Sequence, residues 1–180
     1  MRTRMFSTAT ALAVMALLVI AAPVGAALTP PVVPASIAVP PGNVLYLVGH
    51  AKGYQVYRCQ GTNGSTGWVL AYPFATLYND ANQAVATHYA GPSWTAADTS
   101  TVVATRIGSA AAPGGNAIPW LLLQATSTSG PPGGTFTNTT FIQRINTTGG
   151  LAPATGCDAG HIGALTAVFY TADYYFYRAA

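Results

Sequence analysis

Short runs of alternating hydrophobic and polar residues occupy most of the chain, and no stretch keeps the three- to four-residue spacing of an amphipathic helix. After Asn43, β-branched and aromatic runs are separated by clusters of Gly, Asn, Ser and Thr, as in strands joined by turns. We expect an all-β fold, an antiparallel β-sandwich or barrel of about 8–10 strands. The pattern predicts strands at Val44–Val48, Tyr54–Gln60, Trp68–Ala71, Ala84–Tyr89, Thr101–Ile107, Ile118–Ala125, Thr135–Ile145 and Leu165–Tyr177.

Two of these segments carry further information about burial. Ile118–Leu123 does not alternate, which is typical of a strand buried on both faces, with Pro119 at its beginning or at a bulge. In the last strand, one face carries Tyr170, Ala172, Tyr174 and Phe176, and the other carries Asp173. We interpret these aromatic residues as packing within the sheet; the alternative is an exposed aromatic platform for a glycan.

The first residues have the three-part plan of a secretory signal peptide. Arg2 and Arg4 precede an apolar run from Ala9 to Ala22, and small residues follow at Val24–Ala26. The alternative, a transmembrane anchor, would need about 20 apolar residues, and this run is shorter. We therefore expect a signal peptide at 1–26, a Pro-rich extended lead-in at 27–43 and a single β domain at 44–180, with no membrane span after cleavage.

Composition and charge narrow the classes of function. Hydrophobic residues make up 51% of the chain and charged residues only 6%, which argues against disorder. Without Arg2 and Arg4 the chain has five basic and four acidic residues and no basic stripe. This excludes the electrostatic footprint of a nucleic-acid partner. We expect a secreted or extracytoplasmic protein.

Cys59 and Cys157 are the only cysteines. An exported chain meets an oxidising compartment, so a single disulfide between them is expected, with two buried thiols as the alternative.

No motif identifies a reaction. The three histidines fit no metal-binding spacing, no nucleotide fingerprint is present, and we expect no metal and no cofactor. The alternative is a metal site whose ligands come from separate strands, drawn from His50, His88, Asp98 and Asp173. A hydrolase would have to use His88 with Asp98 or Asp173, and Ser93 or Ser100 could then act as nucleophile.

Ordered motifs along the domain carry a resemblance to a known family. They include Gly49–Cys59, His88–Trp94, Ile118–Leu123, Ile142–Arg144, Thr148–Gly150 and Ala172–Tyr174. The chain resembles a family of secreted bacterial and fungal proteins known as a domain of unknown function, number 3455. Some fungal relatives carry a malate dehydrogenase label, which does not suit a chain without a dinucleotide fingerprint. Where the family tends to have Asp-Gly-Ser, this chain has Asp98-Thr99-Ser100.

The resemblance implies an exported single domain and directs attention to the few polar and aromatic residues within its motifs. We expect Arg144 and Asp173 to form an ion pair. The main hypothesis is a protein that binds a small molecule, glycan or surface partner, and the rival is a small extracellular enzyme using the residues above. Candidate binding residues are His50, Gln55, His88, Trp94, Arg144 and Asp173.

Overall fold

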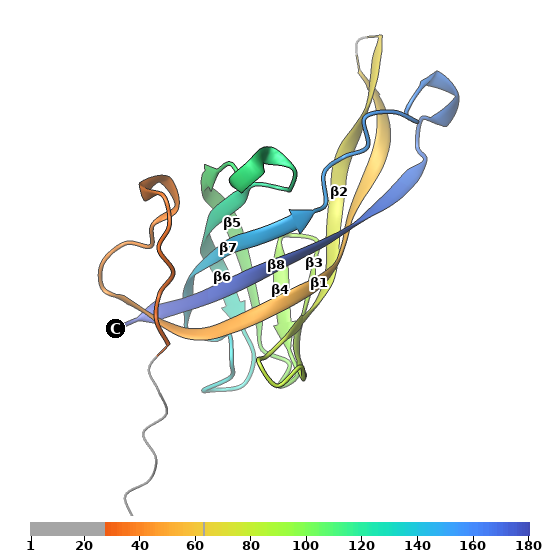
Figure 1. Ribbon diagram of the computed structural model, residues 1–180. Coiled ribbons are helices and arrows are strands. Elements are labelled where there is room, and N and C mark those ends of the chain that lie inside the picture. Colours follow the sequence, from red (N-terminus) through yellow and green to blue (C-terminus); the bar gives the residue numbers. More distant parts are fainter. Residues whose placement is uncertain (1–27, 63) are drawn as a thin grey trace, which may run out of the picture.

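A computed structural model describes residues 28–62 and 64–180, and these residues form a closed antiparallel barrel (Figure 1). Each strand pairs with its neighbour in the sequence, and β1 also pairs with β8 to close the sheet. The all-β expectation is confirmed, in its barrel form. The strands are β1 Asn43–Thr62, β2 Ser65–Tyr78, β3 Ala84–Tyr89, β4 Ser93–Ala96, β5 Thr101–Ala110, β6 Trp120–Ser129, β7 Thr139–Gly149 and β8 Leu165–Ala179.

The remaining regular elements are three short 3-10 turns: η1 Ala35–Ile37, η2 Pro113–Gly115 and η3 Ala159–His161. Among residues 28–62 and 64–180, no helix is long and apolar enough to cross a membrane. The predicted signal peptide at 1–26 lies outside the described residues.

The first strand is longer than the sequence pattern indicates. Val44–Val48 and Tyr54–Gln60 are parts of one strand, β1, because the glycine-containing segment between them pairs with β2 and β8 at the same time. A Cβ atom on Gly53 would lie only 2.2 Å from Phe74 O, so the close approach of β1 and β2 requires glycine there. The short strand β4 was not predicted.

The barrel core is aromatic on the side of β8. The predicted inward face of β8 is confirmed, since Tyr170, Ala172, Tyr174 and Phe176 are all buried. Trp94 is fully buried among them, with its ring 5.5 Å from that of Tyr174 and 6.0 Å from that of Phe176. These inward aromatic rings pack within the core and offer no exposed glycan platform.

The Pro-rich lead-in lies against the outside of the barrel. Ile37 is fully buried there and packs with Leu122 and Ile145, which point outward from β6 and β7. Gln143 Nε2 donates a hydrogen bond to Ile37 O at 2.7 Å. Because the lead-in covers Leu122 on the outer face while Leu123 fills the inner one, the first part of β6 is buried on both faces, as its non-alternating sequence indicated.

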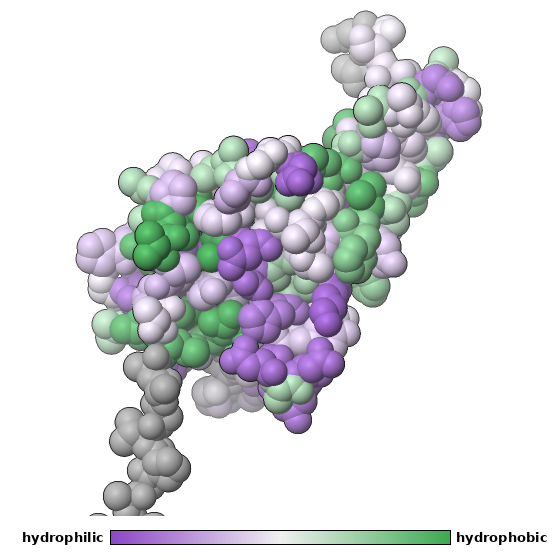
Figure 2. Space-filling view, viewed as in Figure 1, coloured by the Kyte–Doolittle hydropathy of each residue, from purple (hydrophilic) through white to green (hydrophobic). Residues whose placement is uncertain are grey.

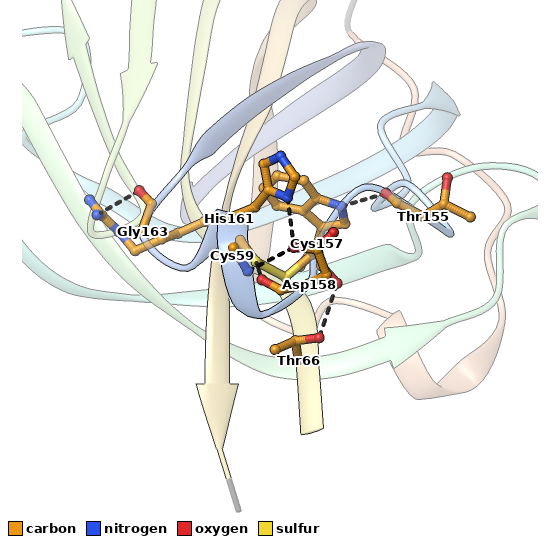
Figure 3. Close-up of a disulfide and its surroundings, with 10 residues drawn as sticks. Cys59, Thr66, Thr155, Cys157, Asp158, His161 and Gly163 are labelled. Carbon is orange, nitrogen blue, oxygen red and sulfur yellow. Dashed lines mark hydrogen bonds and ion pairs between the residues drawn. A yellow bond between two sulfur atoms is a disulfide. The ribbon is translucent and has the colours of Figure 1, made fainter. Parts of the chain in front are cut away.

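A hairpin of β1 and β2 projects beyond the barrel, and we call residues 57–62 and 64–70 the arm (Figure 1). The β7–β8 loop, residues 150–164, lies beside it. The expected disulfide is confirmed: Cys59 on the arm is bonded to Cys157 on this loop (Figure 3). Trp68 Nε1 donates to Thr155 O at 2.8 Å, and Thr66 Oγ1 donates to Cys157 O at 3.0 Å, so hydrogen bonds reinforce the bridge.

Candidate functional site

The barrel is hollow at the end that carries the arm, and we call this hollow the arm-end pocket. Its volume is about 330 Å³, within the range of roughly 300–1,000 Å³ usual for small-molecule sites. Every strand contributes at least one residue, because inward-facing side chains of all eight strands converge at the mouth of the barrel. The lining residues are Gln55, Leu70, Ala71, Tyr72, Pro73, His88, Ala90, Gly91, Pro92, Trp94, Arg106, Leu121, Leu123, Arg144 and Tyr174.

His88, Trp94 and Tyr174 lie together on the buried side of the pocket. The His88 and Trp94 rings are stacked, with centroids 4.3 Å apart and planes within 9° of parallel. The His88 ring is also 5.2 Å from that of Tyr174. His88 Nδ1 carries a proton and donates to Ser93 O at 2.9 Å, because a carbonyl can only accept. This bond fixes the tautomer that leaves Nε2 as an acceptor.

Burial keeps the imidazole of His88 neutral. Complete burial lowers its pKa to about 3, and the nearby charge of Arg144 acts in the same direction. A base with so low a pKa accepts a proton poorly at neutral pH, since the best catalytic pKa lies near the working pH. His88 therefore suits a polar wall of a binding pocket better than a general base.

Arg144 brings a positive charge to the pocket from β7. Its side chain is inward, opposite Leu121 on β6 and Tyr174 on β8, and it is only 9% exposed. Arg144 Nε and Nη2 both donate to Pro119 O, at 3.2 and 2.8 Å. In the described part of the chain no carboxylate pairs with it.

Two further N–H donors border the pocket without acceptors. Gln55 Nε2 and Trp94 Nε1 belong to almost fully buried residues and have no hydrogen-bond partner among the described residues. Buried N–H groups are nearly always paired in folded proteins, so these two can still take an acceptor. Trp120 Nε1, which is not part of the pocket lining, is also buried without a partner among the described residues. The surrounding walls are mainly apolar, from Leu70, Leu121 and Leu123.

His50 and Asp173, two of the predicted site residues, lie outside the pocket. They are directly opposite each other on β1 and β8 and point outward, with His50 Nδ1 2.6 Å from Asp173 Oδ1. His50 Nε2 is 2.9 Å from Asp80 Oδ1, and the hydrogen bonds to Asp173 and Asp80 raise the pKa of His50. Figure 2 shows hydrophilic residues gathered from the middle of β1 and β8 to the β2–β3 turn.

The expected ion pair between Arg144 and Asp173 is wrong. Residue 145, not 144, lies opposite Asp173 in the register, and successive residues of a strand point to opposite faces. Arg144 therefore points into the barrel and Asp173 points out of it, where Asn146 Nδ2 donates to Asp173 Oδ2 at 2.8 Å.

Asp98 lies at the end of the barrel away from the arm, in the turn between β4 and β5. Its Oδ1 accepts from Ser100 N and Oγ, and its Oδ2 accepts from Thr135 N and Oγ1. These hydrogen bonds, the one from Ser100 Oγ first, lower the pKa of Asp98. The structure does not bring His88 together with Asp98 or Asp173, and Asp98 joins two loops.

The structure thus unites four of the predicted residues, Gln55, His88, Trp94 and Arg144, in one pocket. Sequence reasoning missed Arg106, although it shares the inward alternation of Val102 and Ala104 on β5, where a charge is unusual. It also missed the wall formed by Leu70–Pro73 and Leu121, which look like ordinary strand residues. Among the described residues, no group of three His, Cys, Asp or Glu side chains is placed to hold a metal ion.

Comparison with known proteins identifies a family. No curated protein and no solved structure matches the chain significantly. A family model described as "Protein of unknown function (DUF3455)" matches residues 40–178, which include the barrel from β1 to β8. Because this match covers more than half of the chain, the protein belongs to the DUF3455 family.

Proposed function

We propose that the protein is an exported binding protein that holds a small, largely apolar organic molecule in the arm-end pocket. The observation that carries the proposal is the pocket itself: apolar walls surround a few polar groups, which is the usual composition of a small-molecule site. The mouths of β-barrels are common places for such sites.

The character of the lining residues favours binding over hydrolysis. Among residues 28–62 and 64–180, no Ser, Cys, Asp or Glu lines the pocket, so this lining contains no Ser or Cys nucleophile and no carboxylate pair. His88 is held neutral by burial and its Nδ1–H is already bonded to Ser93 O. These residues position and enclose a ligand.

An extracytoplasmic location is part of the proposal. The basic and apolar leader at 1–26 supports export, and the Cys59–Cys157 disulfide is compatible with an oxidising compartment. The small molecule would then be met in the medium or at the cell surface.

A neutral fluorescent probe tests the pocket. N-phenyl-1-naphthylamine becomes brighter in apolar surroundings, so we expect its emission to rise on titration with the purified protein. Ala90→Trp places a large ring at an exposed position of the pocket rim and should weaken binding at least tenfold. Ala81→Trp, at an exposed turn position at the opposite end of the barrel, should bind like the unchanged protein.

Two results would contradict the proposal. One is the absence of any emission increase with the unchanged protein. The other is equal probe affinity for Ala90→Trp and Ala81→Trp, which would place the probe outside the pocket.

A further inference from the structure

Arg144 is a buried cation without a counter-ion. Its guanidinium has five N–H donors, and the Pro119 carbonyl takes one from Nε and one from Nη2. All four aspartates of the chain are described and none of them pairs with it. A charge removed from water is destabilising unless it is paired. An anion bound next to Arg144 would supply the missing counter-ion.

The other groups around the pocket point to the same chemistry. Gln55 Nε2 and Trp94 Nε1 are also donors without acceptors, so the pocket has an excess of unpaired N–H groups. Arg106 adds a second cation at the rim, where it is exposed and makes no hydrogen bond or ion pair within the described residues. In the described part of the chain, no acidic residue lines the pocket to repel an incoming anion.

We propose that the natural ligand is a small organic carboxylate, with its carboxylate against Arg144 and its apolar body against Leu70, Leu121 and Leu123. This inference rests on the proposed function and adds the chemical class of the ligand. A planar carboxylate matches the fork of a guanidinium, and charge-assisted hydrogen bonds are the stronger kind. Arg106 attracts the anion toward the mouth before it is buried.

Two probes of nearly equal shape test the charge directly. Naphthalene-1-acetate carries a carboxylate, and naphthalene-1-acetamide has the same fused rings without the charge. We expect isothermal titration calorimetry at neutral pH to show the acid binding roughly 10- to 100-fold more tightly than the amide, since a hydrogen bond to a charged group contributes on that scale.

Substitutions at Arg144 test whether this side chain causes the tighter binding of the acid. Arg144→Met removes the charge at similar length and should abolish the preference for the acid while the amide still binds. Arg144→Lys keeps the charge but loses the fork and should retain part of the preference. Circular dichroism of each variant checks that the barrel is formed.

A variant that supplies its own carboxylate tests the proposal without touching Arg144. Gln55→Glu replaces a pocket donor with an anion and should weaken binding of naphthalene-1-acetate at least tenfold more than binding of the amide, because only the acid is repelled by the new charge. Gln60→Glu, an exposed position farther along the same strand, is the matched control and should change neither affinity by more than about twofold.

The outcomes separate the two proposals. If the neutral fluorescent probe and the amide bind but the acid has no advantage, the carboxylate inference is overturned and the binding function stands. The carboxylate inference is equally overturned if Arg144→Met keeps the preference for the acid. If no probe binds at all, the proposed function fails and the inference fails with it.

Discussion

Two histidines of the barrel have opposite electrostatic settings. His88 is buried beside Trp94, and burial lowers its pKa to about 3. His50 lies outside the barrel between Asp173 and Asp80, and hydrogen bonds to these carboxylates raise its pKa. Since protonation is disfavoured at one site and favoured at the other, the two residues contribute to stability in different pH ranges.

We predict that His88 makes the fold sensitive to mild acid. The unfolded imidazole takes up a proton below about pH 6.5, whereas folded His88 stays neutral down to about pH 3, so acid stabilises the unfolded state. Its contribution is complete above pH 6.5 and is lost progressively on acidification, at up to roughly 1.4 kcal/mol per pH unit. In His88→Phe, urea unfolding should show a smaller loss of stability between pH 6.5 and 4.5 than in the unchanged protein.

His50→Gln is the control for this measurement. The raised pKa of His50 means that its contribution is present below the unfolded value and is lost as pH rises through the folded one. His50→Gln should therefore preserve or enlarge the acid loss seen between pH 6.5 and 4.5. Equal slopes for His88→Phe and the unchanged protein would show that His88 is not the acid-sensitive group.

Thr99 adopts a backbone conformation that suits glycine better. Its φ is +68°, in the turn between β4 and β5. A residue with a Cβ atom is destabilised by roughly 1–2 kcal/mol in the left-handed region. Glycine avoids this strain, but it loses about 0.5–1 kcal/mol more conformational entropy on folding. Thr99→Gly should raise the free energy of unfolding by up to about 1 kcal/mol in urea denaturation.

Thr99→Ala separates backbone strain from the loss of the threonine side chain. Alanine keeps a Cβ atom at the same positive φ and should gain less than glycine. If both variants unfold at the same urea concentration, the turn relaxes and strain at Thr99 does not explain the effect.

At the scale of elements, the arm depends on the loop that lies beside it. β8 pairs with β1 only as far as Arg58, and beyond that point the β7–β8 loop takes over, with Cys59 N donating to Ala164 O at 2.9 Å. The disulfide links Cys59, in this part of the arm, to Cys157 of the β7–β8 loop (Figure 3). Leu70, at the base of the arm, is also a wall of the pocket.

Removal of the disulfide should therefore destabilise the protein and weaken the probe site. The bridge joins residues 98 positions apart. A loop of this length contributes about 4.7 kcal/mol as an upper value in the chain-entropy view. The Cys59→Ala, Cys157→Ala double variant should unfold at lower urea and bind N-phenyl-1-naphthylamine less tightly than the oxidised protein.

Reduction with dithiothreitol compares the protein with and without the disulfide in an unchanged sequence. It should destabilise the unchanged protein and leave the double variant as it was. An unchanged free energy of unfolding on reduction would contradict the assigned contribution of the bridge.

At the scale of the whole molecule, local sequence patterns predicted individual strands but could not predict how the strands pair or which segments form one continuous strand. The alternation in Leu165–Tyr177 identified the inward face of β8, because a strand has a fixed period of two. Gly49–Gly53 looked like a break, yet pairing on both edges keeps it in β1. β4, with Ser93–Ala96, is too short to give a pattern.

The site could be predicted only in part for the same reason, since local patterns identify residues but not which residues meet in the fold. Gln55, His88, Trp94 and Arg144 attracted attention as polar or aromatic residues within motifs, and the pocket contains them all. Their meeting depends on the register of β1, β3, β4 and β7, which no local pattern reveals. The wrong Arg144–Asp173 pair has the same origin, since a shift of one residue moves a side chain to the other face.

The pairing of the first strand with the last also sets an order of events in folding. β1 meets β2 in a local hairpin, but its other edge stays open until β8 arrives, and Ala180 N then donates to Gly42 O at 3.0 Å. Such non-local closure is slow, and open edges invite pairing with other chains. A chain cut before Leu165 would leave β1 and β7 with unpaired edges. The barrel is therefore completed only once β8 has been synthesised, because this strand pairs with both β1 and β7.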